Sequence, residues 1–370
     1  MYRLDKLNLV KSDLHYNWRD IISVPGAALK PKKIFIASIS LLAALVVYNI
    51  FSYLTLVIEG NSAASIFSNH GLLPNQLLQP EAVAGRLIYY MGILISAFVV
   101  LSGMTAVSII DLENFRGNQF CGAIQAVKFA RRRAKQLFMS LLTIGLFVAF
   151  IVLLGFIVGL ITRIPCLGDL IYSVFFFFPN FIISLLTVVV IFVLMTGIII
   201  MPSAVAADRA GETFNSILGT FSTVIRQPLR WIGYTLYSLV TAKIAGFVFA
   251  YFCFRSLQFL RAVTMLGGGD NVSMLINSGV AHLPLNNKLI SFTAGLFPGI
   301  DFTINFARLG GLPVNMDITS YIMAVSLFLV FLIIWGYIIS IIATGQIYAY
   351  VIIRKIREGN AVTEEEPLFK

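Results

Sequence analysis

The sequence predicts an all-α polytopic membrane protein: a helix bundle of six transmembrane helices with amphipathic interfacial helices and both termini in the cytoplasm. Of its 370 residues, 58% are hydrophobic and only 12% are charged, against roughly 25% charged in ordinary soluble domains. A soluble globular enzyme is excluded as the default, because its surface needs more charge than this. A disordered chain is excluded as well, because disorder requires low hydrophobicity.

Six stretches are long enough to span a bilayer, which takes about 20 apolar residues as a helix. In the fourth stretch Pro179 is expected to interrupt the helix, so residues 172–179 are interpreted as an interfacial or re-entrant lead-in. We expect a cytoplasmic amphipathic N-terminal segment at 1–33, a membrane domain at 34–353 and a cytoplasmic tail at 354–370. The expected spans are 34–58, 87–110, 136–162, 181–201, 231–254 and 321–353.

The long outer loop at 255–320 is not hydrophilic. It holds short apolar segments between glycines and prolines, which favours re-entrant or interfacial pieces. A small cap that contacts a partner is the alternative.

Basic residues set the expected orientation. The two termini and the two loops on their side of a six-span protein hold 20 Lys and Arg residues, whereas the opposite side holds six. Because short cytoplasmic loops are enriched in Lys and Arg, this asymmetry predicts a multi-pass protein of a bacterial inner (cytoplasmic) membrane with N-in/C-in topology.

Three segments have the spacing of amphipathic helices. Near the N-terminus, Leu7, Leu14, Trp18 and Ile21 share a face, and Pro25-Gly26 is expected to end the helix. That helix either lies in the inner membrane interface or packs on the cytoplasmic face of the protein.

The other two segments lie in the expected cytoplasmic loops. The first apolar face, in the loop at 111–135, consists of Phe120, Ile124 and Val127. The second, in the loop at 202–230, consists of Phe214, Ile217, Leu218, Phe221 and Ile225, opposite Ser and Thr residues. Gly117-x-x-Phe120 aligns with Gly211-x-x-Phe214, which suggests either a duplicated two-span unit or a pattern common to interfacial helices.

Basic residues flank these segments and are candidate contacts for anionic lipid headgroups or for a partner protein. They are Lys30, Lys32, Lys33, Arg131, Arg132, Arg133, Arg226 and Arg230. Membrane topology and anionic lipid explain this cluster better than nucleic acid does, so no nucleic-acid partner is expected.

Lys243 is the one ionisable residue expected near the middle of a span. It lies about 18 Å from either end of its span at 1.5 Å per residue, too deep for easy snorkelling. An ionisable residue at such depth marks a candidate functional site, here an intramembrane polar site with Asn49 as one possible partner. The alternative is a structural polar tie between helices.

Patterns typical of catalysis are missing from the sequence. The three histidines are scattered, no HExxH or GxSxG motif occurs, and the cysteines form no CxxC pair. We therefore expect no catalytic residues, no metal and no cofactor.

The segment from Met201 to Phe214, continued through Arg226-Gln-Pro-Leu-Arg230, resembles poorly characterised bacterial six-span families. These include the membrane domain attached to some glycerophosphodiester phosphodiesterases. The shared pattern is a span ending in proline, an amphipathic helix, and then Arg and Pro before the next span. The 370 residues hold no phosphodiesterase domain, so this resemblance implies no active site. In architecture alone, the protein is also similar to six-span ABC exporter permeases.

Two functions follow as hypotheses. The first is a non-enzymatic, membrane-embedded subunit or scaffold of a larger assembly, with membrane lipids and either protein partners or a second copy of the chain as neighbours. The second is a transporter or permease subunit for a lipid or amphipathic substrate, either alone or coupled to an ATPase. An intramembrane enzyme is disfavoured because nucleophile and acid–base sets are missing.

Overall fold

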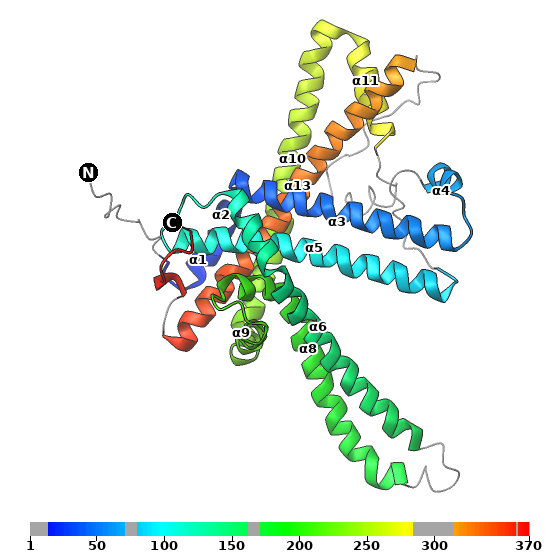
Figure 1. Ribbon diagram of the computed structural model, residues 1–370. Helices are drawn as coiled ribbons and strands as arrows, with labels where there is room; N and C mark the ends of the chain where they lie inside the picture. The colour runs from blue at the N-terminus through cyan, green and yellow to red at the C-terminus, as the bar shows by residue number, and fades with distance from the viewer. Residues whose placement is uncertain (1–13, 71–79, 162–170, 284–313, 360–361, 370) are drawn as a thin grey trace. The chain divides into compact units, whose positions relative to one another are not determined.

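The structure, a computed structural model, describes residues 14–70, 80–161, 171–283, 314–359 and 362–369. Of the described residues, 88% are helical and none is in a strand. Six helices among them are long and apolar enough to cross a membrane, and Figure 1 shows them as long ribbons. The predicted all-α, six-span class is therefore confirmed. The spans are Pro31–Ile58, Val83–Phe115, Ala123–Leu160, Tyr172–Phe192, Pro228–Gly268 and Ile318–Glu358.

The chain divides into two compact units. Unit 1 comprises residues 1–22, 104–236 and 343–370, and unit 2 comprises residues 23–103 and 237–342. Three long helices, α5 (Val83–Phe115), α10 (Pro228–Gly268) and α13 (Val314–Glu358), contribute residues to both.

In unit 2, close helix packing depends on small residues. The α3 helix (Pro31–Ile58) meets α13 at Gly336, where an added Cβ would lie 2.1 Å from the Ser38 hydroxyl oxygen. The Ser38 hydroxyl donates to the Leu332 carbonyl at 3.0 Å. The short α2 helix (Val24–Ala28) is tied to α13 by the Ser340 hydroxyl, which donates to the Ala28 carbonyl at 2.9 Å. Small residues permit this backbone approach, which is the usual basis of helix association in membranes.

The remaining helices of unit 2 differ in length from the sequence prediction. α10 continues well past residue 254, because no glycine or proline interrupts it before Gly267. Gly269 then adopts a positive φ of 58° and starts the turn into α11 (Asp270–Ala281). Residues 284–313, which carry most of the other apolar pieces of the expected outer loop, lie outside the described residues. The short α4 helix (Ala63–His70) follows α3.

In unit 1, the described part of the N-terminal segment begins with α1 (Trp18–Ile22). Ile21 is fully buried and the Trp18 ring packs edge-on against Tyr234 at 4.6 Å between centroids. Leu7 lies outside the described residues. Pro25 and Gly26 lie inside α2 and do not end a helix. Proline is tolerated in the first turn because the backbone nitrogens there have no hydrogen-bond acceptor within the helix.

The fourth span shows a second difference, at Pro179. Residues Tyr172–Phe176 form a π turn, η1, that runs directly into α8 (Phe177–Ala207). In a regular α-helix the proline ring would clash with the carbonyl of Phe175. Phe175 lies within the π turn, whose hydrogen bonds reach one residue further. The helix is therefore continuous through Pro179, and α8 packs beside α6 (Ala123–Ile161), as Figure 1 shows.

The two expected interfacial helices of unit 1 are built differently. Residues 123–135 are the first turns of α6 and continue into the span without a break. Residues Thr213–Arg226 form a separate helix, α9, which Gln227 separates from α10. Proline at the first position of α10 explains the break. The two proposed copies thus share Gly117 and Gly211, both at positive φ, but not their helix boundaries.

Candidate functional site

The polar residues of unit 1 gather where α5, α8 and α13 end. α5 ends in a Schellman motif: the Asn118 amide donates to the Glu113 carbonyl at 2.8 Å and the Gly117 amide to the Asn114 carbonyl at 3.1 Å. Gly117 supplies the required positive φ of 94°. This ending places Glu113 and Arg116, one turn apart, on the same face.

Arg116 and Glu113 form a fully buried ion pair. Both side chains are 0% exposed, and Arg116 Nη1 lies 3.2 Å from Glu113 Oε1. The other side of the guanidinium binds Glu365, with Nη2 2.6 Å from Oε2. Burial lowers the pKa of Arg116, whereas the carboxylates of Glu365 and Glu113 act to raise it. A buried charge of this kind is tolerated because it is paired and hydrogen-bonded.

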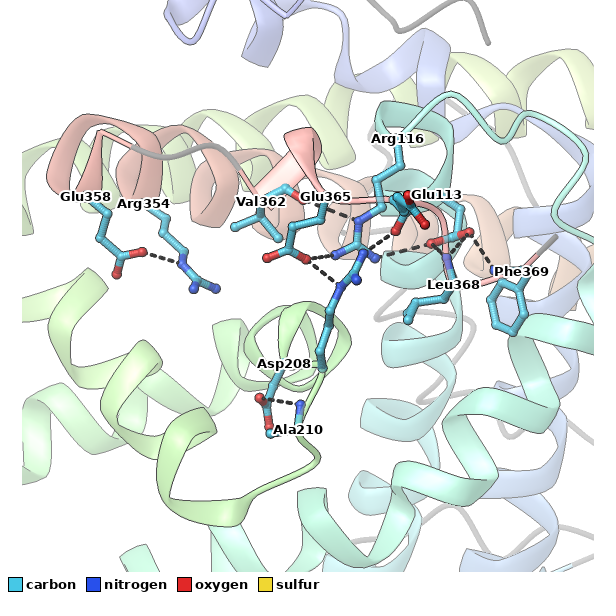
Figure 2. A network of polar contacts seen from close by, with 12 residues as sticks. Glu113, Arg116, Asp208, Ala210, Arg354, Glu358, Val362, Glu365, Leu368 and Phe369 are labelled. Atoms are coloured by element: carbon cyan, nitrogen blue, oxygen red, sulfur yellow. Dashed lines mark hydrogen bonds and ion pairs between the residues drawn. The ribbon is translucent and has the colours of Figure 1, made fainter. Parts of the chain in front are cut away.

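These two residues hold the C-terminal tail, defined here as residues 362–369. Glu113 accepts hydrogen bonds from the backbone amides of Leu368 at 3.0 Å and Phe369 at 3.2 Å. Arg116 Nε donates to the Val362 carbonyl at 3.3 Å. Figure 2 shows the tail bound along the end of α5 in this way. The tail is therefore folded onto unit 1.

Two further contacts fix the ends of the tail. The Asn118 side-chain amide donates to the Phe369 carbonyl at 2.7 Å. At the start of the tail, the hydroxyls of Thr363 and Tyr16 lie 2.7 Å apart. Residues close to both termini of the chain thus lie together in unit 1.

The turn between α8 and α9 contributes a second arginine. Arg209 Nε lies 2.7 Å from Glu365 Oε2, so Glu365 is shared by two guanidinium groups. Arg133, on α6, donates to the Arg209 carbonyl at 2.7 Å and lies over the Phe129 ring.

Gln136 ties α6 to the same turn. Its buried side-chain amide nitrogen lies 2.7 Å from Asp208 Oδ2 and 2.7 Å from Ser216 Oγ, both of which accept. Asp208 in turn accepts hydrogen bonds from the backbone amides of Ala210 and Glu212 at 3.2 and 2.9 Å. These bonds give the α8–α9 turn a defined shape at the site.

The α9 helix packs with its polar face toward the protein. Ser216, Thr220 and Thr223 are buried, and the Thr220 hydroxyl lies 3.4 Å from the Met201 sulfur. Three of the five apolar side chains predicted to form one stripe are exposed, Phe214 at 66%, Leu218 at 49% and Ile225 at 56%. The other two, Ile217 and Phe221, are half-buried. Such an arrangement suits a helix whose outer face meets an apolar environment rather than water.

A cavity of about 600 Å³ lies beside the tail, between α9, the α8–α9 turn and the end of α13. Its charged lining residues are Asp208, Arg209, Arg226, Arg354, Arg357, Glu358 and Glu365. We call it the arginine cavity. Within it Arg354 pairs with Glu358 at 2.8 Å, and Arg357 bonds both Glu358 and the Ser222 hydroxyl.

The basic residues predicted to contact headgroups or a partner differ in their exposure. Lys33 is fully buried and its ammonium donates to the Ala27 carbonyl at 2.8 Å, which holds it inside the protein. Lys32 and Arg133 are half-buried. The exposed members are Lys30, Arg131, Arg132, Arg226 and Arg230.

The candidate intramembrane pair belongs to unit 2. Lys243 is exposed on α10 and, among the described residues, has no hydrogen-bond or ion-pair partner. Asn49 is half-buried on α3, and its Oδ1 atom is enclosed without a donor among the described residues. Within the described part of the chain, no hydrogen bond joins the two side chains.

The tail site is not predicted by any pattern in the sequence. Glu365 lies about 250 residues along the chain from Glu113 and Arg116, and the three residues follow no motif. One feature of the sequence does point to it: three consecutive glutamates at 364–366, in a protein whose loops at 111–135 and 202–230 are basic. A second feature outside the predicted sites is Gly155-x-x-x-Gly159 on α6, a pattern typical of helix association in membranes.

These features define a multi-pass α-helical membrane protein with its polar network at the basic end of unit 1. No family model, no curated protein and no solved structure matches the chain.

Proposed function

We propose that this protein is a non-enzymatic, membrane-embedded subunit of a larger assembly in a bacterial inner membrane. The hairpin of α6 and α8 carries the proposal. In each span we compare the most apolar stretch of 18 residues. In α6 6% of this stretch is buried and in the fourth span none of it is, against 33% and 44% in the first two spans. The most apolar part of each of these two spans thus presents most of its side chains outward.

The exposed face of α6 fits a protein neighbour as well as lipid. Cβ atoms added at Gly145, Gly155 and Gly159 would meet nothing within 4 Å. These glycines lie on one side of the helix by the 100° spacing of its residues. Small residues allow two helices to approach closely, and packing of this kind drives association where no hydrophobic force acts between helices.

Exposed apolar side chains continue past the span. Phe120 and Ile124 are 95% and 84% exposed, next to the exposed residues Lys128 and Arg131. Apolar exposure of this degree beside charged residues is typical of an interaction surface. A partner that packs along α6 would cover these residues together with the glycine face.

The test is the size of the complex purified from native membranes. The variant Gly155→Leu with Gly159→Leu should release the partner or second copy, because the larger side chains keep the neighbouring helix away. The matched control is Leu154→Phe, which adds bulk at a 45% exposed position on a different side of α6. Unchanged mass of the glycine variant by native mass spectrometry would mean that lipid alone surrounds this face.

Orientation is part of the proposal. We place both termini in the cytoplasm, because the end of unit 1 that binds the tail carries the basic loops. The hydrogen bond between Tyr16 and Thr363 supports placing both termini on one side of the membrane.

A permease is the second candidate function, and unpaired polar atoms within the spans favour it. Besides Asn49 Oδ1, the hydroxyl oxygens of Ser52, Ser96 and Ser102 are enclosed without partners among the described residues, all on α3 and α5 of unit 2. Unsatisfied polar atoms in an apolar span are costly unless water or a substrate reaches them. Copurification with a nucleotide-binding subunit would favour this function, and loss of transport in Lys243→Met would place Lys243 on the path.

A further inference from the structure

The arginine cavity holds more positive charge than its carboxylates neutralise. Arg226, Arg354 and Arg357 all line it, and the charges of Arg226 and Arg354 both act on Arg357. Glu358 is the carboxylate bonded to Arg354 and Arg357. Arg226 has no carboxylate or hydrogen-bond partner among the described residues. Like charges held together at the edge of a membrane protein cost free energy unless an anion lies between them.

The chain itself shows that an anion fits at the edge of this cavity. Glu365 lines it and accepts contacts from Arg209 at 2.7 Å and from Arg116 at 2.6 Å. Arg226, Arg354 and Arg357, which form no ion pair with Glu365, also line the cavity. Their planar guanidinium groups suit the paired oxygens of phosphate, to which they donate two parallel hydrogen bonds.

The volume of the arginine cavity and the residues that line it indicate the class of ligand. A cavity of about 600 Å³ lies within the roughly 300–1,000 Å³ of small-molecule sites, so it holds an organic group as well as a phosphate. Ser222, Asn215 and Tyr350 supply neutral polar groups on its wall. Leu218 also lines the cavity and is 49% exposed on the apolar face of α9, so an apolar chain has a surface to follow outward.

We propose that the arginine cavity binds the phosphate of an organic phosphate ester, either the headgroup of an anionic phospholipid or a soluble phosphoester. Arg226, Arg354 and Arg357 supply the charge, and α9 supplies the apolar border. This site is separate from the α6 face on which the proposed function rests, so either can fail without the other.

The experiment uses the full-length protein in lipid nanodiscs and two probes. In one arm, glycerol 3-phosphate is titrated into phosphatidylcholine nanodiscs and followed by calorimetry. In the other arm, phosphatidylglycerol replaces part of the phosphatidylcholine, and bound lipid is counted by native mass spectrometry. Binding in the first arm identifies a soluble ester, and retention in the second identifies a lipid headgroup.

Arg226→Gln is the test variant and Arg230→Gln the control. Arg226 lines the cavity, whereas Arg230 is exposed, bonds Gln227 at 3.1 Å and does not line it. We expect Arg226→Gln to weaken binding roughly tenfold or more, because a charge-assisted hydrogen bond is lost, and Arg230→Gln to leave binding almost unchanged. Thermal unfolding without probe establishes that both variants are folded. The proposal is overturned if neither probe binds, or if both variants weaken binding equally, since that result indicates surface charge alone.

Discussion

At Arg116 a permanently charged side chain is withdrawn completely from solvent. Its guanidinium contacts Glu113 on its own helix and Glu365 on the tail, so its charge is neutralised from two directions. Buried ion pairs contribute little to stability compared with apolar packing, but breaking one is costly. The pair therefore acts mainly to specify where the tail binds.

Replacing Arg116 by Met should destabilise unit 1 and release the tail. The change leaves Glu113 buried without its counterion, which typically costs about 3–5 kcal/mol. Thermal unfolding in detergent measures the loss, and limited proteolysis reports the released tail. The control, Arg131→Met, removes an exposed charge and should change neither measurement; equal effects of the two variants would contradict this role for Arg116.

Gln136 is the second residue with a large expected effect. Gln136→Leu keeps a similar volume but removes the donor to Asp208 and Ser216. Leaving buried acceptors without a donor costs about 1–3 kcal/mol. Lys135→Leu, at the exposed neighbouring position, is the control, and thermal unfolding compares the two. A tolerated Gln136→Leu would show that water replaces the amide.

At the scale of the element, α9 is distinguished by the direction of its apolar face. In water an amphipathic helix buries its apolar face. Three of the four buried residues of α9 are instead polar, Ser216, Thr220 and Thr223, and the fourth is Val224. The packing is tight, since an added Cβ at Gly197 of α8 would lie 3.0 Å from the Thr220 methyl group. Small polar side chains allow such close contact between helices and satisfy their hydroxyls there.

Two opposite substitutions test this direction. Thr220→Leu should destabilise the protein by about 1–3 kcal/mol through overpacking. Leu218→Thr, at a 49% exposed position, should change stability in detergent by less than about 0.5 kcal/mol. Thermal unfolding of both variants is the measurement. If the apolar face of α9 pointed inward, Leu218→Thr would destabilise the protein more than Thr220→Leu.

At the scale of the whole molecule, the proposed orientation places both ends of the chain in the cytoplasm, and two fusions test it. Green fluorescent protein fused after Lys370 should fluoresce, because it folds in the cytoplasm. Alkaline phosphatase inserted in the exposed turn at Gly60-Asn61 should be active, because that turn follows the first span and faces the opposite side. Fluorescence and phosphatase activity of the two fusions measure the orientation; a silent tail fusion together with an inactive insertion would reverse it.

Local sequence patterns determined the fold class and the helix faces. Six apolar stretches predicted six spans because a bilayer sets a minimum length for a helix, and all six are present. The residues of the α9 stripe, Phe214 to Ile225, were likewise identified from helical spacing. Helix ends were less well predicted, because α10 and α5 continue past the apolar residues until a glycine stops them.

Only the tertiary structure decided which faces meet the protein and which distant residues pair. The spacing along α9 shows that its apolar residues share a side, but within a membrane burial does not drive that side inward. Lys33 was expected at the surface and is buried on the Ala27 carbonyl. Glu113 and Glu365 converge on Arg116 only because α5 and the end of α13 come together in unit 1. A contact across about 250 residues of chain leaves no trace in local periodicity.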